Sequence, residues 1–503
     1  VRNTYVKAAR GSKVTGAATL RKFLEDDKIV NRILDWAGSP IVNLLQEYND
    51  RYAVVTLEGK FRIADTDVKP GEQPVFYLKE DFVNVVATDY SSITDDKGRP
   101  IPKSKIWLSS NQRRFYKGVD FLPGQESDGQ VLNLWTGWAV QPDKKAKCTA
   151  WLKLLKDIIC GGDQELCDWM LHWFANILRE PMNKSLTAPV VIGNQGAGKS
   201  LLFAYFGRIL GPAYITVTNE EHIYGRFNRH LASCLLLHSE EALYGGERKH
   251  RGIIKSLITD EHRIFEQKGV DAKRVRNFLR LSLTSNYAHA APAEAGDRRY
   301  TVIDLKDRML SKDLENKVLA EMHGDGPAAL MHYLLHMGYD PKLARTNVKN
   351  EELAAMKTAN YEPLEAWWHD TLASGMLVPD ALAWATEPVK DDWTAIVGSS
   401  ALYTSMTLSF KERGLRMIPG QMSFALSIDK FVGRKLERKQ KWFSNPMTEG
   451  MPQSIRMMSD RQSTIINMPT LAECREAFEK YLGQKIEWPA DEDERPEKVD
   501  VKY

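Results

Sequence analysis

No stretch of this sequence constrains its folding more than Gly193-Asn194-Gln195-Gly196-Ala197-Gly198-Lys199-Ser200. The stretch matches the pattern G-x-x-x-x-G-K-[ST], whose glycines let backbone N–H groups approach phosphate oxygens without a Cβ in the way. We expect Lys199 to reach the β- and γ-phosphates of a nucleoside triphosphate and the Ser200 hydroxyl to hold Mg²⁺. The alternative is a chance glycine-rich turn, which predicts no ligand.

The residues on both sides of this loop predict the strand–loop–helix order that a phosphate loop needs. Residues 190–192 form an apolar run typical of a buried strand, and residues 201–206 are apolar enough to begin a helix. A helix N-terminus at this place adds partial positive charge to an anion site. We therefore expect ATP and Mg²⁺ as ligands, with nucleotide contacts from Gly193, Asn194, Gln195, Gly196, Ala197, Gly198, Lys199, Ser200 and Leu201.

Composition is that of an ordinary globular protein. Of the 503 residues, 43% are hydrophobic and 27% are charged, which suits about three or four folded domains. No apolar run reaches the ~18 residues of a membrane span, and the 5 scattered cysteines form no C-x-x-C pair. These features favour a cytoplasmic protein without a membrane partner.

The net charge of +3 is too small to indicate nucleic-acid binding by itself. Local clusters carry more information. One begins at residues 247–251 and continues through Lys268, Lys273 and Arg274, and another occupies residues 434–443 beside aromatic side chains. Each cluster alone can also be a solvated helix face, so these residues become DNA-binding candidates only through their context.

An apolar stretch that ends in paired carboxylates follows the loop along the chain. Residues 234–239 predict a strand, and Glu240 and Glu241 stand at its carboxyl end, where open α/β sheets bind ligands. We expect Glu240 to bind Mg²⁺ directly or through water, and Glu241 to polarise an attacking water. An exposed acidic turn is the alternative.

A later apolar stretch, residues 279–285, ends in Asn286, whose amide can hydrogen-bond a γ-phosphate and an attacking water. The pair Arg298 and Arg299 follows, and arginine suits a transition state whose charge spreads over phosphoryl oxygens. Each feature is weak alone, because such strands and arginine pairs are common. Their order along the chain makes Lys199, Glu240, Glu241, Asn286, Arg298 and Arg299 the catalytic candidates.

Residues from about 130 to 305 resemble superfamily 3 helicases, above all the helicase module of phage, plasmid and poxvirus-type primase-helicases. Beyond the loop, the resemblance rests on short signatures in the expected order. These are residues 133–138 (NLWTGW), 225–228 (GRFN), 255–260 (KSLITD), 266–269 (EQKG) and 297–299 (DRR).

The resemblance implies an AAA+ core in a homo-hexameric ring that moves along single-stranded or forked DNA, typically 3′ to 5′. It implies that Arg298 or Arg299 of one subunit reaches the γ-phosphate bound by its neighbour. Lys268 would lie at the tip of a hairpin in the central channel, with Lys273 and Arg274 beside it. Residues 263–267 and 274–278 can indeed pair as strands, and such a basic tip would follow phosphates without reading bases.

Two features depart from that family. Glu240 stands where many relatives have Asp, and the N-terminal part is short for the primase domain that often precedes the helicase module. Asp65-Thr66-Asp67 can be read as a two-metal polymerase motif, but a turn at a strand end is the better interpretation. We therefore expect no primase activity from these residues, and a primase domain upstream of Val1 or a separate primase or polymerase partner would fit.

The expected fold class is α/β, with a P-loop AAA+ core flanked by smaller domains. The expected divisions are an N-terminal α/β region (1–147), a helical collar for oligomerisation (148–184) and the core (185–310). A helical extension (311–380), a winged-helix-like DNA-binding domain (381–488) and a charged tail (489–503) follow. The apolar stripe of the second collar helix, from Leu166 to Ile177, predicts core packing.

These observations together predict an ATPase that drives a replicative DNA helicase of a phage or mobile element, in the cytoplasm of a bacterial host. One alternative is a DNA-binding origin-recognition or loading protein that uses ATP as an assembly switch. A small-molecule phosphotransferase is a weaker alternative, because it explains neither the Glu-Glu strand nor the late arginines. Sequence separates the first two poorly, since the same loop and arginines serve both.

Overall fold

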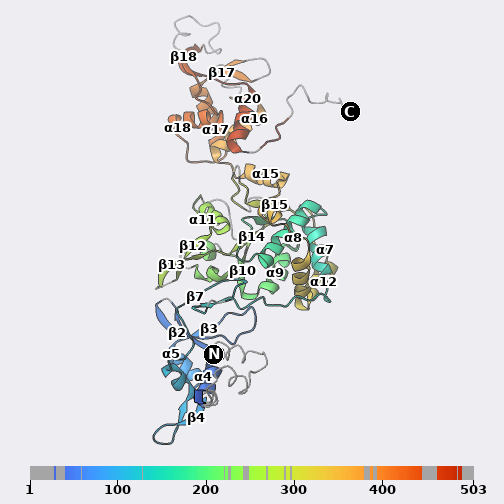
Figure 1. The fold of residues 1–503 in the computed structure, drawn as a ribbon. Coiled ribbons are helices and arrows are strands. Elements are labelled where there is room, and N and C mark those ends of the chain that lie inside the picture. Colours follow the sequence, from blue (N-terminus) through green and yellow to red (C-terminus); the bar gives the residue numbers. More distant parts are fainter. Residues whose placement is uncertain are drawn as a thin grey trace, which may run out of the picture.

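The computed structural model describes residues 28–29, 40–57, 59–126, 129–219, 221–224, 228–241, 248–267, 270–287, 291–294, 297–378, 386–388, 393–443, 461–483 and 485–489. Its helices and strands form three groups that follow one another along the long axis of the molecule (Figure 1). The architecture is mixed α/β, which confirms the fold class at that level. No helix of the described part is long and apolar enough to cross a membrane.

The N-terminal group is built on a four-stranded sheet with the order β3-β2-β1-β6. Helices α4 and α6 cover one face of it around a core that contains Tyr48, Val54 and Trp107. Its elements are α4 (Pro40–Arg51), β1 (Tyr52–Leu57), β2 (Lys60–Asp65), β3 (Val75–Tyr77), α5 (Lys79–Val85), β4 (Tyr90–Thr94), β5 (Pro100–Pro102), α6 (Lys103–Ser109), β6 (Phe115–Tyr116), β7 (Gly118–Asp120) and β8 (Val131–Asn133).

The central group is organised by a parallel five-stranded sheet with the order β10-β11-β14-β9-β15. Strands buried on both faces read as continuous apolar runs, and β9 has every residue buried. The strands are β9 (Ala188–Ile192), β10 (Tyr214–Val217), β11 (Leu236–Glu240), β14 (Arg280–Ser285) and β15 (Tyr300–Asp304). This order places β9 between β14 and β15, with β11 on the far side of β14.

Helices and short turns surround this sheet. They are α7 (Thr149–Lys153), η1 (Leu154–Ile159), α8 (Gln164–Arg179), α9 (Lys199–Leu210), η2 (Gly211–Ala213), α10 (Glu221–Tyr224), η3 (Arg229–Ser233), α11 (Arg248–Thr259), α12 (Lys312–His323), α13 (Gly326–His336), α14 (Pro341–Arg345) and α15 (Glu351–Ala359). The Asp163 side chain accepts a hydrogen bond from Leu166 N and begins α8, as its N-cap position predicts.

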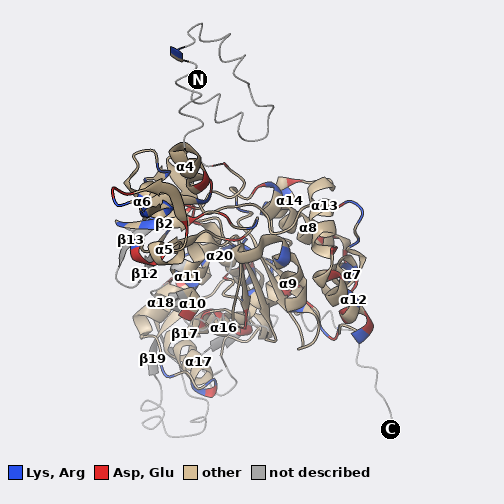
Figure 2. Ribbon diagram, turned by 90° about the horizontal axis from the view of Figure 1, so that it is seen from below, with Lys and Arg blue, Asp and Glu red and all other residues tan. Residues whose placement is uncertain are grey.

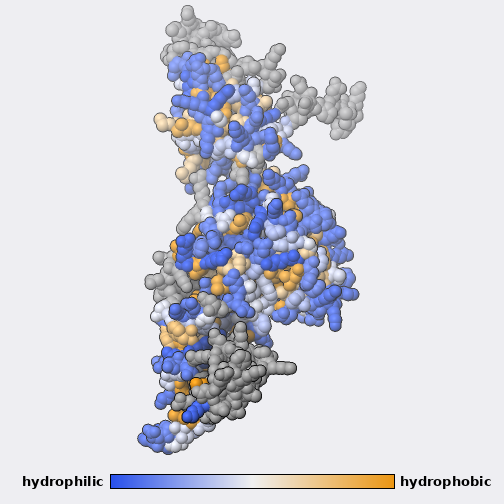
Figure 3. Space-filling view, viewed as in Figure 1, coloured by the Kyte–Doolittle hydropathy of each residue, from blue (hydrophilic) through white to orange (hydrophobic). Residues whose placement is uncertain are grey.

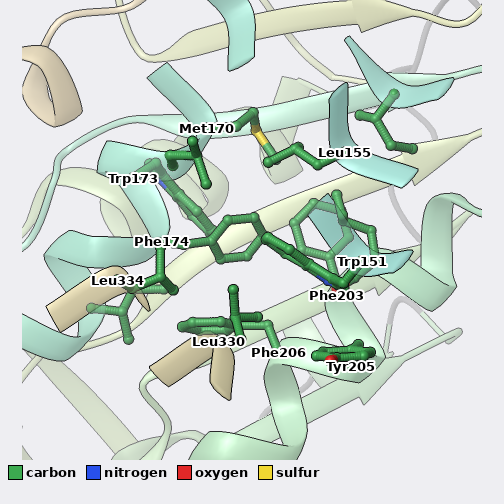
Figure 4. Close-up of a cluster of buried hydrophobic side chains, with 14 of the residues drawn as sticks. Trp151, Leu155, Met170, Trp173, Phe174, Phe203, Tyr205, Phe206, Leu330 and Leu334 are labelled. Carbon is green, nitrogen blue, oxygen red and sulfur yellow. The ribbon is translucent and has the colours of Figure 1, made fainter. Parts of the chain in front are cut away.

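The largest core joins α7, α8, α9 and α13 (Figure 4). Trp173 and Phe174 of α8 meet Phe203 and Phe206 of α9, with ring centres 4.6 Å apart for Phe174 and Phe206. The apolar stripe of α8 is thus buried inside this chain, which confirms its predicted packing role. Residues 148–184 were also expected to mediate oligomerisation. That function stays a prediction, because the apolar stripe of α8 packs within this chain and cannot itself contact a second copy.

A two-stranded hairpin, β12 (His262–Gln267) and β13 (Val270–Arg276), extends from the central group. Its antiparallel register places Ile264 opposite Arg274. The structure confirms a hairpin here, but its second strand is Val270–Arg276 and not the predicted 274–278.

The C-terminal group has a four-stranded sheet with the order β16-β17-β19-β18 and four helices packed with it. Its elements are α16 (Pro363–Ser374), β16 (Thr386–Pro388), β17 (Thr394–Gly398), α17 (Ser399–Glu412), α18 (Gln421–Phe431), β18 (Arg438–Phe443), β19 (Arg461–Asn467) and α20 (Leu471–Leu482).

Candidate functional site at the carboxyl edge of the central sheet

A cavity of about 550 Å³ lies at the carboxyl edge of the central sheet. Residues 195–201 line it together with Glu240, Glu241 and Asn286. These residues are up to 91 positions apart in the chain (from 195 to 286), yet the parallel strands β9, β11 and β14 end at the same edge. The structure therefore brings together most of the residues that the sequence predicts for nucleotide binding.

The loop between β9 and α9 turns through two glycines in the left-handed region. Gly196 has a φ of 83° and Gly198 has a φ of 85°, a conformation that side chains with a Cβ rarely adopt. The Gly193 N–H donates to Ser285 O at 3.1 Å, which ties the loop to β14. Because α9 begins at Lys199, the N–H groups of its first turn have no partners within the helix, and the first three residues of the helix line the cavity.

Lys199 is buried, and its ammonium nitrogen Nζ has three acceptors. They are the carbonyl oxygens of Gly193 at 2.6 Å and Asn194 at 2.8 Å, and the Asn286 side-chain oxygen at 3.0 Å. Burial lowers the pKa of Lys199, and the nearby carboxylates of Glu241 and Glu240 oppose that effect. Asn286 is the only side chain among these acceptors.

Glu240 ends β11 with its carboxylate partly exposed in the cavity. Hydrogen bonds from His238 and, to a smaller extent, from the Ser200 hydroxyl lower the pKa of Glu240 to about 2. The His238 ring is fully buried, and burial lowers its own pKa, so we treat this ring as neutral at pH 7. His238 therefore acts on Glu240 as a neutral hydrogen-bond partner and not as a counter-ion.

The His238 ring is held in place by neighbouring side chains. Its Nδ1 lies 2.9 Å from Ser282 Oγ of β14, and its plane stacks on Phe203 with centres 4.6 Å apart. A histidine fixed in this way orients the carboxylate that follows it in β11. Sequence alone gave no reason to select His238, because its partners come from other elements.

Glu241 and Asn286 form a second polar contact at the cavity. Glu241 has a φ of 54°, which is uncommon for a residue with a side chain, and its N–H donates to Thr284 O at 3.0 Å. The Asn286 side-chain nitrogen donates to the Glu241 carboxylate. Asn286 thus links Lys199 to Glu241, with its oxygen facing one and its nitrogen facing the other.

The donor set of the cavity suits a magnesium triphosphate. Ser200 and Glu240 offer hard oxygen ligands that line the same cavity. No cluster of three or more His, Cys, Asp or Glu side chains in the described ranges could hold a metal. Mg²⁺ in nucleotide sites takes only one or two protein carboxylates and obtains further ligands from phosphates and water, so the residues present fit this ion.

Arg298 and Arg299 lie at the opposite edge of the sheet. The Ala188 N–H donates to Arg299 O at 2.8 Å, beside the amino ends of β9 and β15. Arg299 pairs with Asp297 at 3.0 Å, while Arg298 is exposed. Neither arginine lines the cavity, so any role for them in nucleotide chemistry stays a prediction.

The three predicted DNA contacts fall on the β12–β13 hairpin. Lys268 lies outside the described residues. Lys273 belongs to β13, and its side chain is likewise outside the described part. Arg274 is exposed on the same strand. Their contact with DNA stays a prediction.

Sequence reasoning missed several residues that line the cavity: Thr218, Thr284, Ser285, Leu310 and Glu315. Leu310 and Glu315 come from the segment that follows β15, and no motif marks them. A weak signal was available for α12 itself, because the Ser311 side chain accepts from Leu314 N as an N-cap.

Known proteins resemble this chain in three ways. Residues 191–299, which include the loop and the Arg pair, match DUF5906, a family of unknown function. The DNA primase-polymerase of Nitratiruptor phage NrS-1 is 27% identical over 138 residues, which are 27% of this chain and 19% of that protein. The chain thus matches about a fifth of the length of that curated relative.

Solved structures of the NrS-1 C-terminal region share the fold. One apo structure has a TM-score of 0.57 at 15% identity and covers 86% of this chain and 100% of that chain. Another has a TM-score of 0.54 at 17% identity and covers 74% of this chain and 90% of that chain.

These relatives correct the functional expectation. The assignment to superfamily 3 helicases is wrong, and so are the replicative helicase and the helicase-coupled ATPase reaction, because the relatives lead to a primase-polymerase. They do not support an origin-loading protein or a phosphotransferase either. The physical reason is that loop, carboxylate and Asn motifs report on phosphates and metal, and the same motifs serve different reactions.

Proposed function

We propose that this chain is part of a DNA replication protein related to phage primase-polymerases, and that its central sheet binds a nucleoside triphosphate with Mg²⁺. The cavity at the carboxyl edge carries the proposal, because residues 195–201, Glu240, Glu241 and Asn286 all face it. The match of residues 191–299 to one family supports a single module around that cavity. Such a protein would act in the cytoplasm of a bacterial host.

The finer fold assignment, a P-loop core of the AAA+ kind, belongs to the same proposal. Its support is the order β9, glycine loop, α9, with β11 and β14 supplying polar residues at their carboxyl ends. For residues 381–488 we propose the winged-helix-like arrangement, since α17 and α18 precede the strand pair β18–β19. The exposed Lys439 on β18 suits a DNA partner.

The cavity residues that the sequence predicts have distinct roles in this proposal. The loop N–H groups and Lys199 hold the phosphates, and Ser200 and Glu240 hold Mg²⁺. A phosphate oxygen would exchange with the Asn286 oxygen at Lys199, since the two backbone acceptors belong to the loop itself. Asn286 and Glu241 would then lie beside the terminal phosphate.

Primer synthesis is assigned to none of the described residues. Asp65 is buried and pairs with Arg51 at 2.9 Å. The Asp67 N–H donates to the Asp65 carboxylate at 3.1 Å, so the segment 65–67 is the strand-end turn that the sequence predicts. Polymerase chemistry would therefore require residues other than this pair.

The proposal includes self-assembly only if Arg298 or Arg299 contacts the bound triphosphate. Arg298 is exposed at the amino edge, whereas the cavity opens at the carboxyl edge. A strand of five residues spans about 16 Å, so Arg298 could reach a triphosphate only in a second copy. Six copies, as in a ring, are one arrangement that satisfies this requirement.

Calorimetric titration with ATP, GTP and the four dNTPs, with and without Mg²⁺, tests the nucleotide site. We expect micromolar binding that requires Mg²⁺ and becomes about a hundredfold weaker in Lys199→Ala. Binding of labelled DNA by the same protein tests the replication assignment. Full nucleotide affinity in the variant would overturn the site, and absence of both nucleotide and DNA binding would overturn the function.

A further inference from the structure

Two phenylalanines on the N-terminal sheet are exposed. Phe61 of β2 is 45% exposed and Phe115 of β6 is 46% exposed. Phenylalanine side chains are usually buried. Exposed apolar side chains that gather on one surface often mark a contact site for another molecule. Figure 3 shows hydrophobic side chains at the surface over this part of the N-terminal group.

The register places both rings on one face of the sheet. Phe61 is opposite Thr56 of β1, and Phe115 is opposite Val54 of the same strand. Because Thr56 and Val54 are two positions apart, their side chains share a face, and so do those of their partners. The two phenylalanines thus flank β1 on one surface.

Helices cover only part of that face. Val54 and Ile63 are fully buried under α4 and α6, against Tyr48 and Trp107. Phe61 and Phe115 extend the same face beyond this cover. The exposed rings therefore continue a packed core outward, on a rigid support.

A cation is fixed beside the Phe61 ring. The Arg113 guanidinium carbon lies 5.9 Å from the centre of the Phe61 ring. Its Nη1 donates to Leu108 O at 2.5 Å and more weakly to Ser110 O at 3.4 Å. These bonds to the end of α6 hold the guanidinium in place, so that it offers charge next to an aromatic face.

The charge around the rings is mixed. Lys60 and Arg62 are the neighbours of Phe61 along β2, so their side chains point to the opposite face of the sheet, and the cation beside the Phe61 ring is Arg113. Glu80 and Asp81 supply exposed carboxylates from the first turn of α5. Exposed rings with a fixed guanidinium beside one of them suit single-stranded nucleic acid, whose bases stack on rings while a phosphate meets the cation.

We propose that Phe61, Phe115 and Arg113 form a stacking platform for single-stranded DNA. The inference rests on the proposed replication function and adds a second, nucleotide-independent contact to it. Figures 1 and 2, seen from perpendicular directions, place the strands of this sheet and the β12–β13 hairpin on the same side of the molecule. A strand bound to the platform can continue past exposed Arg274 of that hairpin.

Fluorescence anisotropy with a labelled 20-nucleotide oligothymidine tests the platform, using the full chain and no added nucleotide. Each of Phe61→Ala and Phe115→Ala should weaken binding about tenfold, and Phe61→Trp should retain it. Tyr90→Ala is the matched control, since Tyr90 is a 55% exposed aromatic of β4 in the same group. Affinity for a duplex of equal length should change less than twofold in all variants.

The outcomes separate this inference from the proposed function. Wild-type affinity for oligothymidine in both alanine variants overturns the platform, whatever DNA binding remains. Oligothymidine binding that is absent in the wild type overturns it as well, and intact magnesium triphosphate binding would then leave the nucleotide site standing. Photo-crosslinking from a benzoyl-phenylalanine at position 61, but not at position 90, would support the platform directly.

Discussion

Two lysines of the central group have the same exposed fraction but lie at opposite edges of the sheet, in different surroundings. Lys199 and Lys184 are each 8% exposed, and each donates to backbone carbonyls. Lys199 faces a cavity with Glu240 and Glu241, whose charges oppose the pKa-lowering effect of burial. Lys184 donates to Leu257 O at 2.6 Å, and burial together with Arg280 and Arg263 lowers its pKa to about 6.

The difference shows what distinguishes a lysine that can bind a ligand from one that holds the fold. Both edges of the sheet contain buried basic residues, but Lys199 lines a cavity together with Glu240 and Glu241, whereas the Lys184 ammonium nitrogen lies against the backbone carbonyls of Leu257 and Asp260. At the amino edge the bonds of Arg280 and Lys184 hold the chain around residues 180–184. Burial of a lysine is therefore no mark of a ligand site unless groups that can exchange partners lie beside it.

The largest expected effect is a loss of stability when the buried Arg280 at the amino edge of the sheet is replaced. Arg280 is fully buried and donates to four backbone carbonyls and the Asn176 side chain. Arg280→Met leaves these acceptors unpaired and should lower the free energy of unfolding by on the order of 4 kcal/mol. Urea denaturation followed by circular dichroism measures it. Arg345→Ala, which removes a half-exposed pair with Glu180, should cost under about 1 kcal/mol, and equal losses would contradict this account.

The next largest effect is a loss of nucleotide affinity when Lys199 at the carboxyl edge is replaced. Lys199→Ala should reduce affinity for magnesium triphosphate by about a hundredfold, roughly 2.7 kcal/mol, with little change in melting temperature. Lys184→Met, the matched buried lysine, should leave that affinity within about twofold. Titration of both variants with a fluorescent ATP analogue distinguishes them. Equal losses of affinity would mean that burial, and not position at the cavity, sets the function of these lysines.

The pH dependence of stability should separate Lys184 from its replacement. Its folded pKa of about 6 lies below the ordinary 10.5, so the unfolded chain holds one more proton between those values. The free energy of unfolding should therefore rise with pH in that range, by up to about 1.4 kcal/mol per unit, and gain nothing from this group below pH 6. Urea denaturation at pH 7, 8 and 9 should show this slope in the wild type relative to Lys184→Met; parallel curves would mean that the amine is charged.

The smallest effect concerns the metal. Glu240→Gln should raise the Mg²⁺ concentration that supports nucleotide binding by about tenfold, because the ion loses a charged ligand. Glu315→Gln changes another carboxylate that lines the cavity and should shift it less than twofold. Because the pKa of Glu240 is about 2, the ratio of the Mg²⁺ requirements of Glu240→Gln and the wild type should be the same at pH 5 and pH 8, since protonation of the nucleotide phosphate affects both proteins alike. A ratio that falls to one at pH 5 would contradict an ionised Glu240.

Local signals predicted the parts of the site that lie on continuous segments. The loop around Lys199, the strand that ends at Glu240 and the strand before Asn286 were all visible as short patterns, and the structure brings them to one cavity. What no pattern could supply were contacts set by tertiary packing, such as His238 beneath Glu240 and Glu315 from α12. The assignment of a reaction failed for a different reason, since the motifs describe the phosphates and not the second substrate.

Contacts near both ends of α9 hold this helix in a fixed position. It begins at Lys199 beside the loop and ends at Leu210, a length of about 18 Å. Trp151 Nε1 donates to Leu202 O at 3.0 Å near its start, and the Ala139 N–H donates to Ile209 O at 2.9 Å near its end. Spin labels placed at the two ends should therefore give the same narrow distance distribution with and without nucleotide. That distance can serve as an internal reference when movements of the N-terminal and C-terminal groups are measured.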